Sequence, residues 1–244
     1  MEADCGFAAL ASDLTAPSAT WPREWKGKAR MDIVARLGAC YTSAVHDVMR
    51  EFGYDRFILP SNIRPLETDQ KVCGRIWTFG GHPNRGASAD DTYMQWTAMI
   101  SAAPASHVLV CQPRTSELAV MGELSAKALQ MRGVLGYVAD GGCRDVEVIR
   151  ASGFPVFCTF RTPNDIVGRW LPDGLGEPIS IGDVSLSTGD FLLADADGIV
   201  IVPPERIEAV VARTEKVMST ESEVRKAILA GMDAHSAYLR HRKF

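Results

Sequence analysis

GELSAKALQMRGVLGYVADGGCRD, residues 122–145, is the stretch that decides the fold. The apolar run at 118–121 predicts a short strand, residues 123–132 a helix, and residues 134–139 the next buried strand, with Gly133 ending the helix. Two strand ends therefore place a helix N-terminus and the pair Arg144-Asp145 on the same side of a sheet. Ligands of α/β sheets usually bind on that side.

The turn at Gly122 predicts an anion site. The first backbone N–H groups of a helix have no partner within the helix, and they favour carboxylate or phosphate. Glycine lets such an anion approach the backbone closely. The alternative is an ordinary strand-to-helix turn without a ligand.

Arg144-Asp145 adds a chemical function to this turn. The pair follows two glycines at a strand end, where side chains are exposed and contribute little to packing. An arginine fork matches a carboxylate, and aspartate is an oxygen ligand suited to Mg²⁺. The alternative is an Asp145 that caps a helix beside a surface Arg144. Because Glu123 stands near the same turn, the functional interpretation is favoured.

A third group of polar residues lies on a second predicted helix, at His46, Asp47 and Glu51. Asp47 and Glu51 are four residues apart and project from one face, a spacing that is unfavourable unless a cation faces it. The alternative is a solvated acidic face. The later segment Asp195–Gly198 superficially resembles a calcium loop, but its position between strands predicts a hairpin turn.

Composition limits the class of protein. The chain has 244 residues, 46% of them hydrophobic and 23% charged, and its net charge of −4 comes from 26 basic and 30 acidic side chains. These values are typical of a soluble globular protein, and no basic block predicts binding to nucleic acid. No apolar run predicts a membrane span or a signal peptide. Six scattered cysteines without a Cys-x-x-Cys pair favour a reduced, cytoplasmic protein.

The chain divides into an irregular N-terminal arm, residues 1–28, and a single domain, residues 29–244. Glycines predict that a first helix, near 31–37, stops at Gly38 and that residues 80–91 form a loop after a strand at 71–79. Thr42 or Ser43 is expected to cap the second helix. Residues 178–202 predict antiparallel hairpins, and the chain is helical from 204 onward. The whole pattern predicts a mixed α/β layered domain.

Taken together, these motifs resemble the RraA-like family. The segments that carry the resemblance are residues 122–128, 133–145, 153–157, 189–190 and 195–203, and the resemblance covers roughly residues 30 to 232. This family includes metal-dependent (class II) pyruvate aldolases acting on 4-hydroxy-4-methyl-2-oxoglutarate and 4-carboxy-4-hydroxy-2-oxoadipate. It also includes non-enzymatic regulators of ribonuclease E.

The resemblance implies a compact β/β/α layered fold of the swivelling-domain type with helical N- and C-terminal extensions. It implies a homotrimer or homohexamer with active sites between subunits. Asp145 matches the direct ligand of Mg²⁺ or Mn²⁺, and Glu123 matches an acid that contacts the metal through water. Arg144 matches the residue that holds the pyruvyl group, and the segment 122–125 (Gly122, Glu123, Leu124 and Ser125) the carboxylate cradle.

The second half of the site is implied to come from a neighbouring subunit. Val45-His46-Asp47 is similar to a Val-His-Glu segment of the aldolases, so Asp47 and Glu51 would be acids contributed across the interface. Either Glu221 or Glu223 matches a further acid near the C-terminal end. Two features depart from the family pattern: Pro104-Ala105-Ser106 replaces the usual Pro-Gly-Asp, and the arm has no counterpart.

The function expected from this resemblance is cleavage of a 4-hydroxy-2-oxo acid by a retro-aldol reaction that releases pyruvate, with oxaloacetate decarboxylation as a side activity. The partner molecule is then a small 2-oxo acid rather than nucleic acid or membrane. One alternative is a non-catalytic regulator of the ribonuclease E inhibitor type. Another is a related lyase or hydratase that acts on a different oxo acid.

Overall fold

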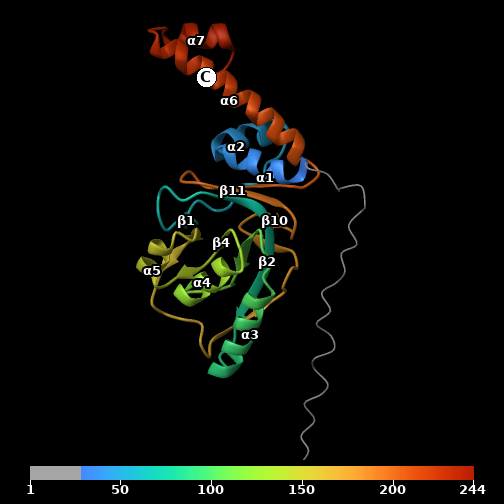
Figure 1. Cartoon of the computed structure of the whole chain (residues 1–244), viewed down its shortest axis with the longest axis vertical. Helices are drawn as coiled ribbons and strands as arrows, with labels where there is room; N and C mark the ends of the chain where they lie inside the picture. The colour runs from blue at the N-terminus through green and yellow to red at the C-terminus, as the bar shows by residue number, and fades with distance from the viewer. Residues whose placement is uncertain (1–28) are drawn as a thin grey trace, which may run out of the picture.

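A curled mixed sheet forms the centre of the protein (Figure 1), whose computed structural model describes residues 29–244. The strand order is β1-β6-β4-β3-β2-β11-β12, and β8 pairs with the far end of β2. The strands of this sheet are β1 (Arg64–Pro65), β2 (Val72–Pro83), β3 (His107–Gln112), β4 (Gly136–Ala139), β6 (Val156–Cys158), β8 (Trp170–Asp173), β11 (Phe191–Ala194) and β12 (Ile199–Val202).

Four neighbouring strands, β2, β3, β4 and β6, run parallel to one another. Parallel strands need crossover connections. Here the connections carry α3 (Ala89–Ala102), α4 (Glu123–Met131) and α5 (Val146–Ser152). These helices cover one face of the sheet, over a core that includes Phe79, Trp96 and Tyr137. The parallel order places the loops after β3 and β4 at the same edge of the sheet.

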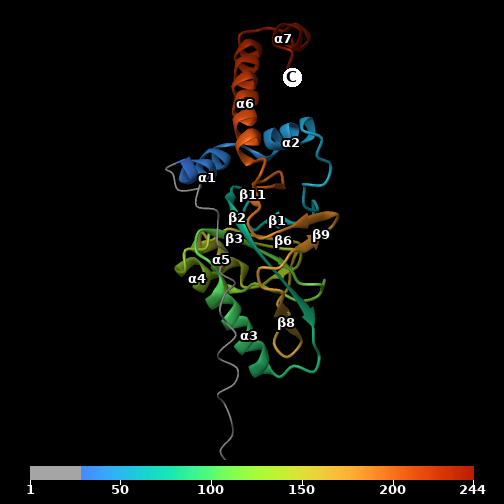
Figure 2. The ribbon, with the colours of Figure 1, turned by 90° about the vertical axis from the view of Figure 1, so that its right-hand side faces the viewer.

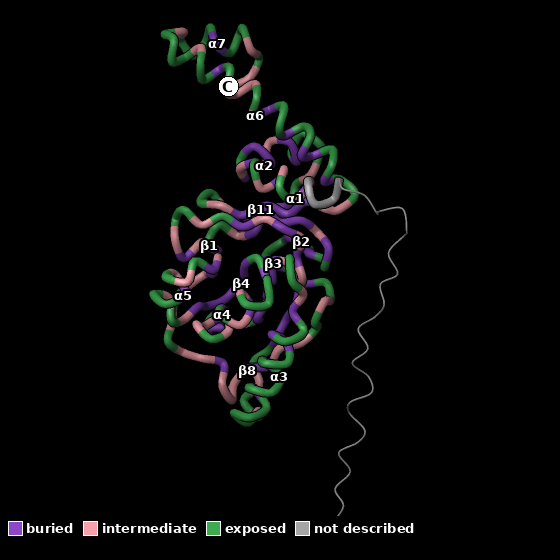
Figure 3. Tube along the Cα trace, viewed as in Figure 1, coloured by how far each residue is buried: buried purple, intermediate pink, exposed green. Residues whose placement is uncertain are grey.

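The opposite face of the sheet is covered by a hairpin, β9 (Ile179–Ile181) and β10 (Val184–Leu186). Strand β11 separates the two sides: Leu192 packs toward the hairpin, whereas Phe191 and Leu193 pack toward helices. This alternation follows from the two-residue period of a strand. Figure 3 shows the sheet as a largely buried layer within the described residues. The predicted β/β/α layering and the predicted hairpins are therefore confirmed.

A second group of helices packs on β11 and β12. It consists of α1 (Ala29–Ala39), α2 (Thr42–Glu51) and the start of α6 (Ile207–Leu229). Figure 2 shows α6 standing away from the sheet, and α7 (Ala234–His241) packs against α6. No helix in residues 29–244 is both long and apolar enough to cross a membrane. The predicted arm, residues 1–28, lies outside the described residues.

Four local predictions were wrong. The segment predicted as a loop at 80–91 begins as strand, because β2 continues to Pro83 and pairs with β8, and helix α3 then begins at Ala89. Helix α2 has no side-chain cap, because the Thr42 hydroxyl is used to bind Asp195 at 2.6 Å. The predicted strand at 118–121 makes a single bridge, between Ala119 and Gly142. Helix α1 also runs through Gly38.

Gly81 explains why β2 can continue as a strand. A Cβ at this position would lie 1.7 Å from a ring atom of Trp170, which crosses β2 here and donates a hydrogen bond from Nε1 to the Pro113 carbonyl at 2.8 Å. We expect Gly81→Ala to lower the free energy of unfolding by about 3 kcal/mol, because the buried ring cannot yield without losing that bond. Urea denaturation would measure the loss. Gly86→Ala is the matched control, since its nearest contact is 3.4 Å from a side-chain oxygen.

Candidate functional site

Arg144-Asp145 lies between a two-residue strand and helix α5. The strand, β5 (Gly142–Cys143), pairs in parallel with β7 (Phe160–Arg161). Asp145 follows in the left-handed conformation, with φ 54° and ψ 35°. Aspartate and asparagine adopt this conformation more readily than most residues with a Cβ. The sharp turn explains how the chain leaves the sheet edge with both side chains displayed.

The Asp145 carboxylate is directed at helix α4 rather than at α5. It stands at the N-cap position of α5 but makes no side-chain capping bond there. Instead, its Oδ2 accepts a hydrogen bond from the backbone N–H of Glu123 at 3.1 Å. A Cβ at Gly122 would lie 2.9 Å from the same oxygen. Asp145 therefore does not cap α5 but accepts the first N–H of α4, which is a helix cap of the kind that the sequence left as the alternative, and Gly122 is required by this close approach.

Arg144 is held between two carboxylates. Its Nη1 donates to Asp165 at 3.1 Å, and its Nε lies 3.4 Å from Asp145. Asp165 is fixed in turn by Arg169 at 2.8 Å. Partial burial opposes ionisation of Asp165, but hydrogen bonds from Arg169, the Val167 N–H and Arg144 outweigh it and lower its pKa. The sequence analysis missed Asp165. The signal that could have identified it is the polar turn that follows β7, the strand paired with β5.

Arg144 and Asp145 border a cavity of about 420 Å³. Its walls carry the guanidinium groups of Arg144 and Arg161, the carboxylates of Asp145 and Glu147, and a threonine hydroxyl. A small dianionic molecule would find both charge and hydrogen-bond donors here. The lining residues are Cys143, Arg144, Asp145, Val146, Glu147, Arg161, Thr162 and Pro163. Arg161 was also missed, because nothing in the local sequence places it beside Arg144.

The predicted carboxylate cradle lies at the start of α4, beside this cavity. Glu123 is half-buried and its backbone N–H is taken by Asp145, whereas Leu124 is 80% exposed. The Ser125 hydroxyl accepts a hydrogen bond from Trp96 Nε1 at 2.8 Å, which ties the first turn of α4 to α3. The Ser125 hydroxyl only accepts in this bond, so its own O–H is still available to donate to a ligand.

The donor set here fits a hard, hydrated cation. Asp145 and Glu123 supply oxygen ligands, and Mg²⁺ often takes one or two protein carboxylates while keeping several waters. Within residues 29–244, no three His, Cys, Asp or Glu side chains are grouped so as to hold a metal ion. That finding argues against a closed zinc-type site among the described residues. It leaves a site of the magnesium type compatible with Asp145 and Glu123.

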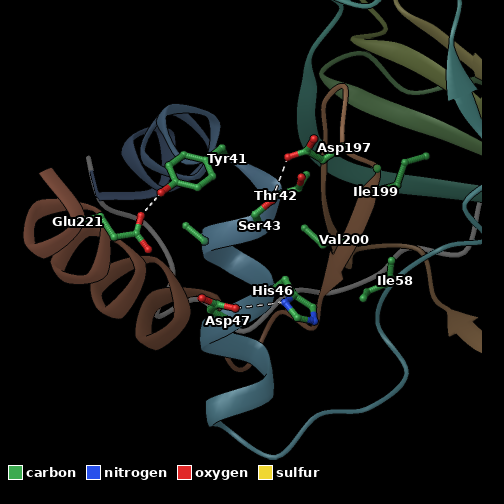
Figure 4. A pocket seen from close by; sticks show the side chains of 12 residues that line it. Tyr41, Thr42, Ser43, His46, Asp47, Ile58, Asp197, Ile199, Val200 and Glu221 are labelled. Atoms are coloured by element: carbon green, nitrogen blue, oxygen red, sulfur yellow. Dashed lines mark hydrogen bonds and ion pairs between the residues drawn. The ribbon is translucent and has the colours of Figure 1, made fainter. Parts of the chain in front are cut away.

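A second polar cavity, of about 250 Å³, lies between α2, α6 and β12 (Figure 4). His46 and Asp47 project into it from α2, and Glu221 from α6. The Tyr41 hydroxyl donates a hydrogen bond to Glu221. Glu223, in contrast, pairs with Lys226 at 2.8 Å on the exposed side of α6. Within one chain, Glu221 and not Glu223 therefore shares a cavity with Asp47.

Cations face Asp47 and Glu51, as their spacing required. Arg213 pairs with Glu51 at 3.0 Å, and Lys243 pairs with Asp47 at 3.0 Å. Glu51 lies outside the cavity of Figure 4 and contributes to a separate depression beside Arg213. In Figures 1 and 2, α2 and α6 lie at one end of the sheet and α4 and α5 at another. Within one chain, Asp47 and Glu51 are thus not brought to Arg144-Asp145.

Comparison with known proteins identifies relatives over most of the chain. The family model "RraA-like: Aldolase/RraA" matches residues 42–201. A Halalkalibacterium halodurans protein named "Putative 4-hydroxy-4-methyl-2-oxoglutarate aldolase" is 26% identical over 87% of this chain and 96% of its own length. Protein DlpA of Legionella pneumophila is also 26% identical over 84% of this chain, but the chain spans only 33% of that larger protein.

Solved structures agree with this assignment. Streptomyces coelicolor RraAS2, described as an unusual member of the RNase ES inhibitor RraA protein family, superposes with a TM-score of 0.73. It is 25% identical and covers 80% of this chain and 97% of its own. A protein described among novel cellulases from gut-associated microbes is 31% identical, with a TM-score of 0.74 over 84% of this chain and 90% of its own. With two thirds of its length matched by the family model, the chain belongs to the RraA-like family.

Proposed function

We propose that the protein is a divalent-metal-dependent lyase that cleaves a 4-hydroxy-2-oxo acid by a retro-aldol reaction and releases pyruvate. The observation that carries the proposal is the arrangement of Arg144 and Asp145 at the N-terminus of α4, facing a cavity of about 420 Å³. The aldolase names of several relatives support a lyase of this class.

Substrate binding follows from the charges around the cavity. The Arg144 guanidinium has five N–H donors; Asp165 takes one on Nη1 and Asp145 lies beside Nε, so the remaining donors can take a 2-oxo acid carboxylate. The N–H groups at the start of α4 and the positive end of its dipole favour the same anion. Arg161 lines the cavity and offers a second cation for a further carboxylate of the substrate.

Bond cleavage requires stabilisation of negative charge and removal of one proton. A divalent cation held by Asp145, with Glu123 reached through water, would act as a Lewis acid toward the pyruvyl oxygens. Arg144 stabilises the enolate charge that develops when the carbon–carbon bond breaks. A base takes the proton of the 4-hydroxyl group, which becomes the carbonyl product, and the enolate is protonated to pyruvate. Loss of CO₂ from oxaloacetate gives the same enolate.

The base is assigned to one of two sources. The first is a water molecule positioned by Glu123. The second is the carboxylate group at Asp47, with Glu221 beside it, donated by a second copy of the chain. The separation of α2 from α4 and α5 supports an assembly in which each site is shared between subunits, as a trimer or hexamer would provide. Glu51, bound to Arg213, is a weaker candidate than Asp47.

The metal requirement is tested with oxaloacetate. We expect pyruvate formation, followed with lactate dehydrogenase and NADH, to need added Mg²⁺ or Mn²⁺ and to fall at least about 100-fold in EDTA. Free divalent ions also decarboxylate oxaloacetate, so each rate is corrected with a protein-free sample that contains the same metal. A corrected rate of zero would refute the lyase. It would favour the rival, a non-catalytic regulator like the RNase ES inhibitors among the structural relatives.

A further inference from the structure

Lys243, which follows α7, bridges two acids that belong to different helices. Its Nζ lies 3.0 Å from Asp47 Oδ2 on α2 and 3.2 Å from Glu221 Oε1 on α6. The three side chains are 23% to 34% exposed, so each is largely withdrawn from water. Ion pairs of this kind are screened less than surface pairs. The residue that closes this contact is 196 positions away from Asp47 in the sequence.

The second carboxylate oxygen of each acid, the one that does not face Lys243, also has partners. Asp47 Oδ1 lies 3.3 Å from His46 Nδ1 and 3.3 Å from Arg50 Nη2. Glu221 Oε2 accepts a hydrogen bond from the Tyr41 hydroxyl, the contact drawn in Figure 4. The result is a continuous chain of polar contacts from Tyr41 through Glu221, Lys243 and Asp47 to His46, in which every residue except Lys243 lines the cavity.

Lys226, on α6 like Glu221, makes an ordinary surface ion pair and serves for comparison. It contacts Glu223 at 2.8 Å, three residues away, and both side chains are more than half exposed. Such a pair contributes little to stability or geometry. Lys243 differs because it joins separate elements, and because the next residue, Phe244, lines an apolar groove on α6 with Val224 and Ile228.

We propose that Lys243 is a positioning residue for proton transfer: its ammonium group fixes the Asp47 and Glu221 carboxylates against one another at the wall of the α2–α6 cavity. The proposal rests on the proposed function in one respect, that Asp47 serves as the base for the 4-hydroxyl proton. Lys243 itself is expected to touch neither substrate nor metal.

Electrostatics gives the proposal a measurable sign. Partial burial raises the pKa of Asp47, but the hydrogen bond and charge of Lys243, with His46 and Arg50, outweigh it and lower that pKa. The other charged groups that face this pair are Glu51, Glu221 and Arg213. Partial burial lowers the pKa of Lys243, whereas its two acids raise it by more. Removing the ammonium group must therefore move the pKa of Asp47 upward, so that the base is lost at a higher pH.

The experiment compares Lys243→Met, Lys243→Arg and the control Lys226→Met in the full chain with Mg²⁺. Retro-aldol cleavage of 4-hydroxy-4-methyl-2-oxoglutarate needs a base for the hydroxyl proton, whereas decarboxylation of oxaloacetate does not. We expect Lys243→Met to lower kcat for cleavage about tenfold while decarboxylation changes less than about twofold. Lys243→Arg should restore most of the cleavage rate, and Lys226→Met should change neither.

A second measurement does not depend on activity. The pKa of the Asp47 carboxyl group can be followed by NMR through its carboxyl carbon signal, which is assigned with Asp47→Asn. This pKa should move upward in Lys243→Met and stay low in Lys243→Arg. An unchanged Asp47 pKa, or an equal loss in both reactions, overturns the role of Lys243. If the parent protein releases no pyruvate from either substrate, the proposed function fails. The NMR titration then still decides whether Lys243 holds the acid pair.

Discussion

Asp145→Asn should reduce metal-dependent pyruvate release by about 1000-fold, which is about 4 kcal/mol of transition-state stabilisation. The carboxylate charge is the feature that a hard cation requires, and asparagine removes it while keeping an oxygen of the same shape. That oxygen can still accept the Glu123 N–H, now 3.1 Å away. Asparagine also tolerates the left-handed backbone at this position, where φ is 54°. Steady-state kinetics at saturating Mg²⁺ would measure the loss.

The control for this substitution is Asp183→Asn. Asp183 is exposed on the turn between β9 and β10, so the same chemical change there should leave activity and thermal stability unaltered. Isothermal titration with Mn²⁺ separates binding from folding, since Asp145→Asn should lose Mn²⁺ affinity without a fall in Tm. An Asp145→Asn protein that binds Mn²⁺ and works like the parent would remove Asp145 from the mechanism.

Arg144→Lys is the second large effect that we expect, with kcat/KM lower by about 100-fold. Lysine keeps the positive charge but lacks the planar fork that can bind a carboxylate through two parallel hydrogen bonds and still reach Asp165 at 3.1 Å. Most of the loss should appear in KM, because the substrate carboxylate is bound before the bond breaks. Kinetics with oxaloacetate across a wide concentration range would resolve the two constants.

Two companion variants define what Arg144 does. Arg144→Met should be worse than Arg144→Lys, since it removes the charge that stabilises the enolate and leaves Asp165 with Arg169 as its remaining arginine. Arg85→Met, at an exposed loop position, is the control for loss of an arginine. Equal kcat/KM values for Arg144→Met and Arg85→Met would exclude Arg144 from substrate binding.

Local chemistry explains why half of the candidate site could be predicted. Gly122, Glu123, Arg144 and Asp145 lie within 24 residues, and the helix and strand between them follow ordinary periodicity. Two successive strand ends of a parallel sheet must share an edge, so the meeting of these residues needed no knowledge of the distant chain. The hairpins at 178–202 were predictable for a similar reason, since each turn is marked by Gly-Asp or Asp-Gly.

The errors share a different cause, contact between distant segments. Gly80-Gly81 was expected to break the strand, yet glycine is what lets Trp170 cross it. Thr42 was expected to cap α2, but Asp195 takes its hydroxyl from 153 positions away. Arg161 reaches the cavity through the pairing of β5 with β7, and Asp165, further along the same segment, reaches Arg144. No window of sequence contains both members of these pairs, so propensity and periodicity could not find them.

The length of α6 sets a constraint of another kind. The helix runs from Ile207 to Leu229. The number of residues in α6 fixes the direction in which the following segment, which includes α7 and Lys243, leaves the helix. Inserting or deleting one residue between Glu221 and Leu229 would turn α7 by about 100° and shift it by about 1.5 Å. Lys243 would then point away from Asp47. Selection on this part of the chain should therefore act on gaps in an alignment more severely than on exchanges of its exposed residues.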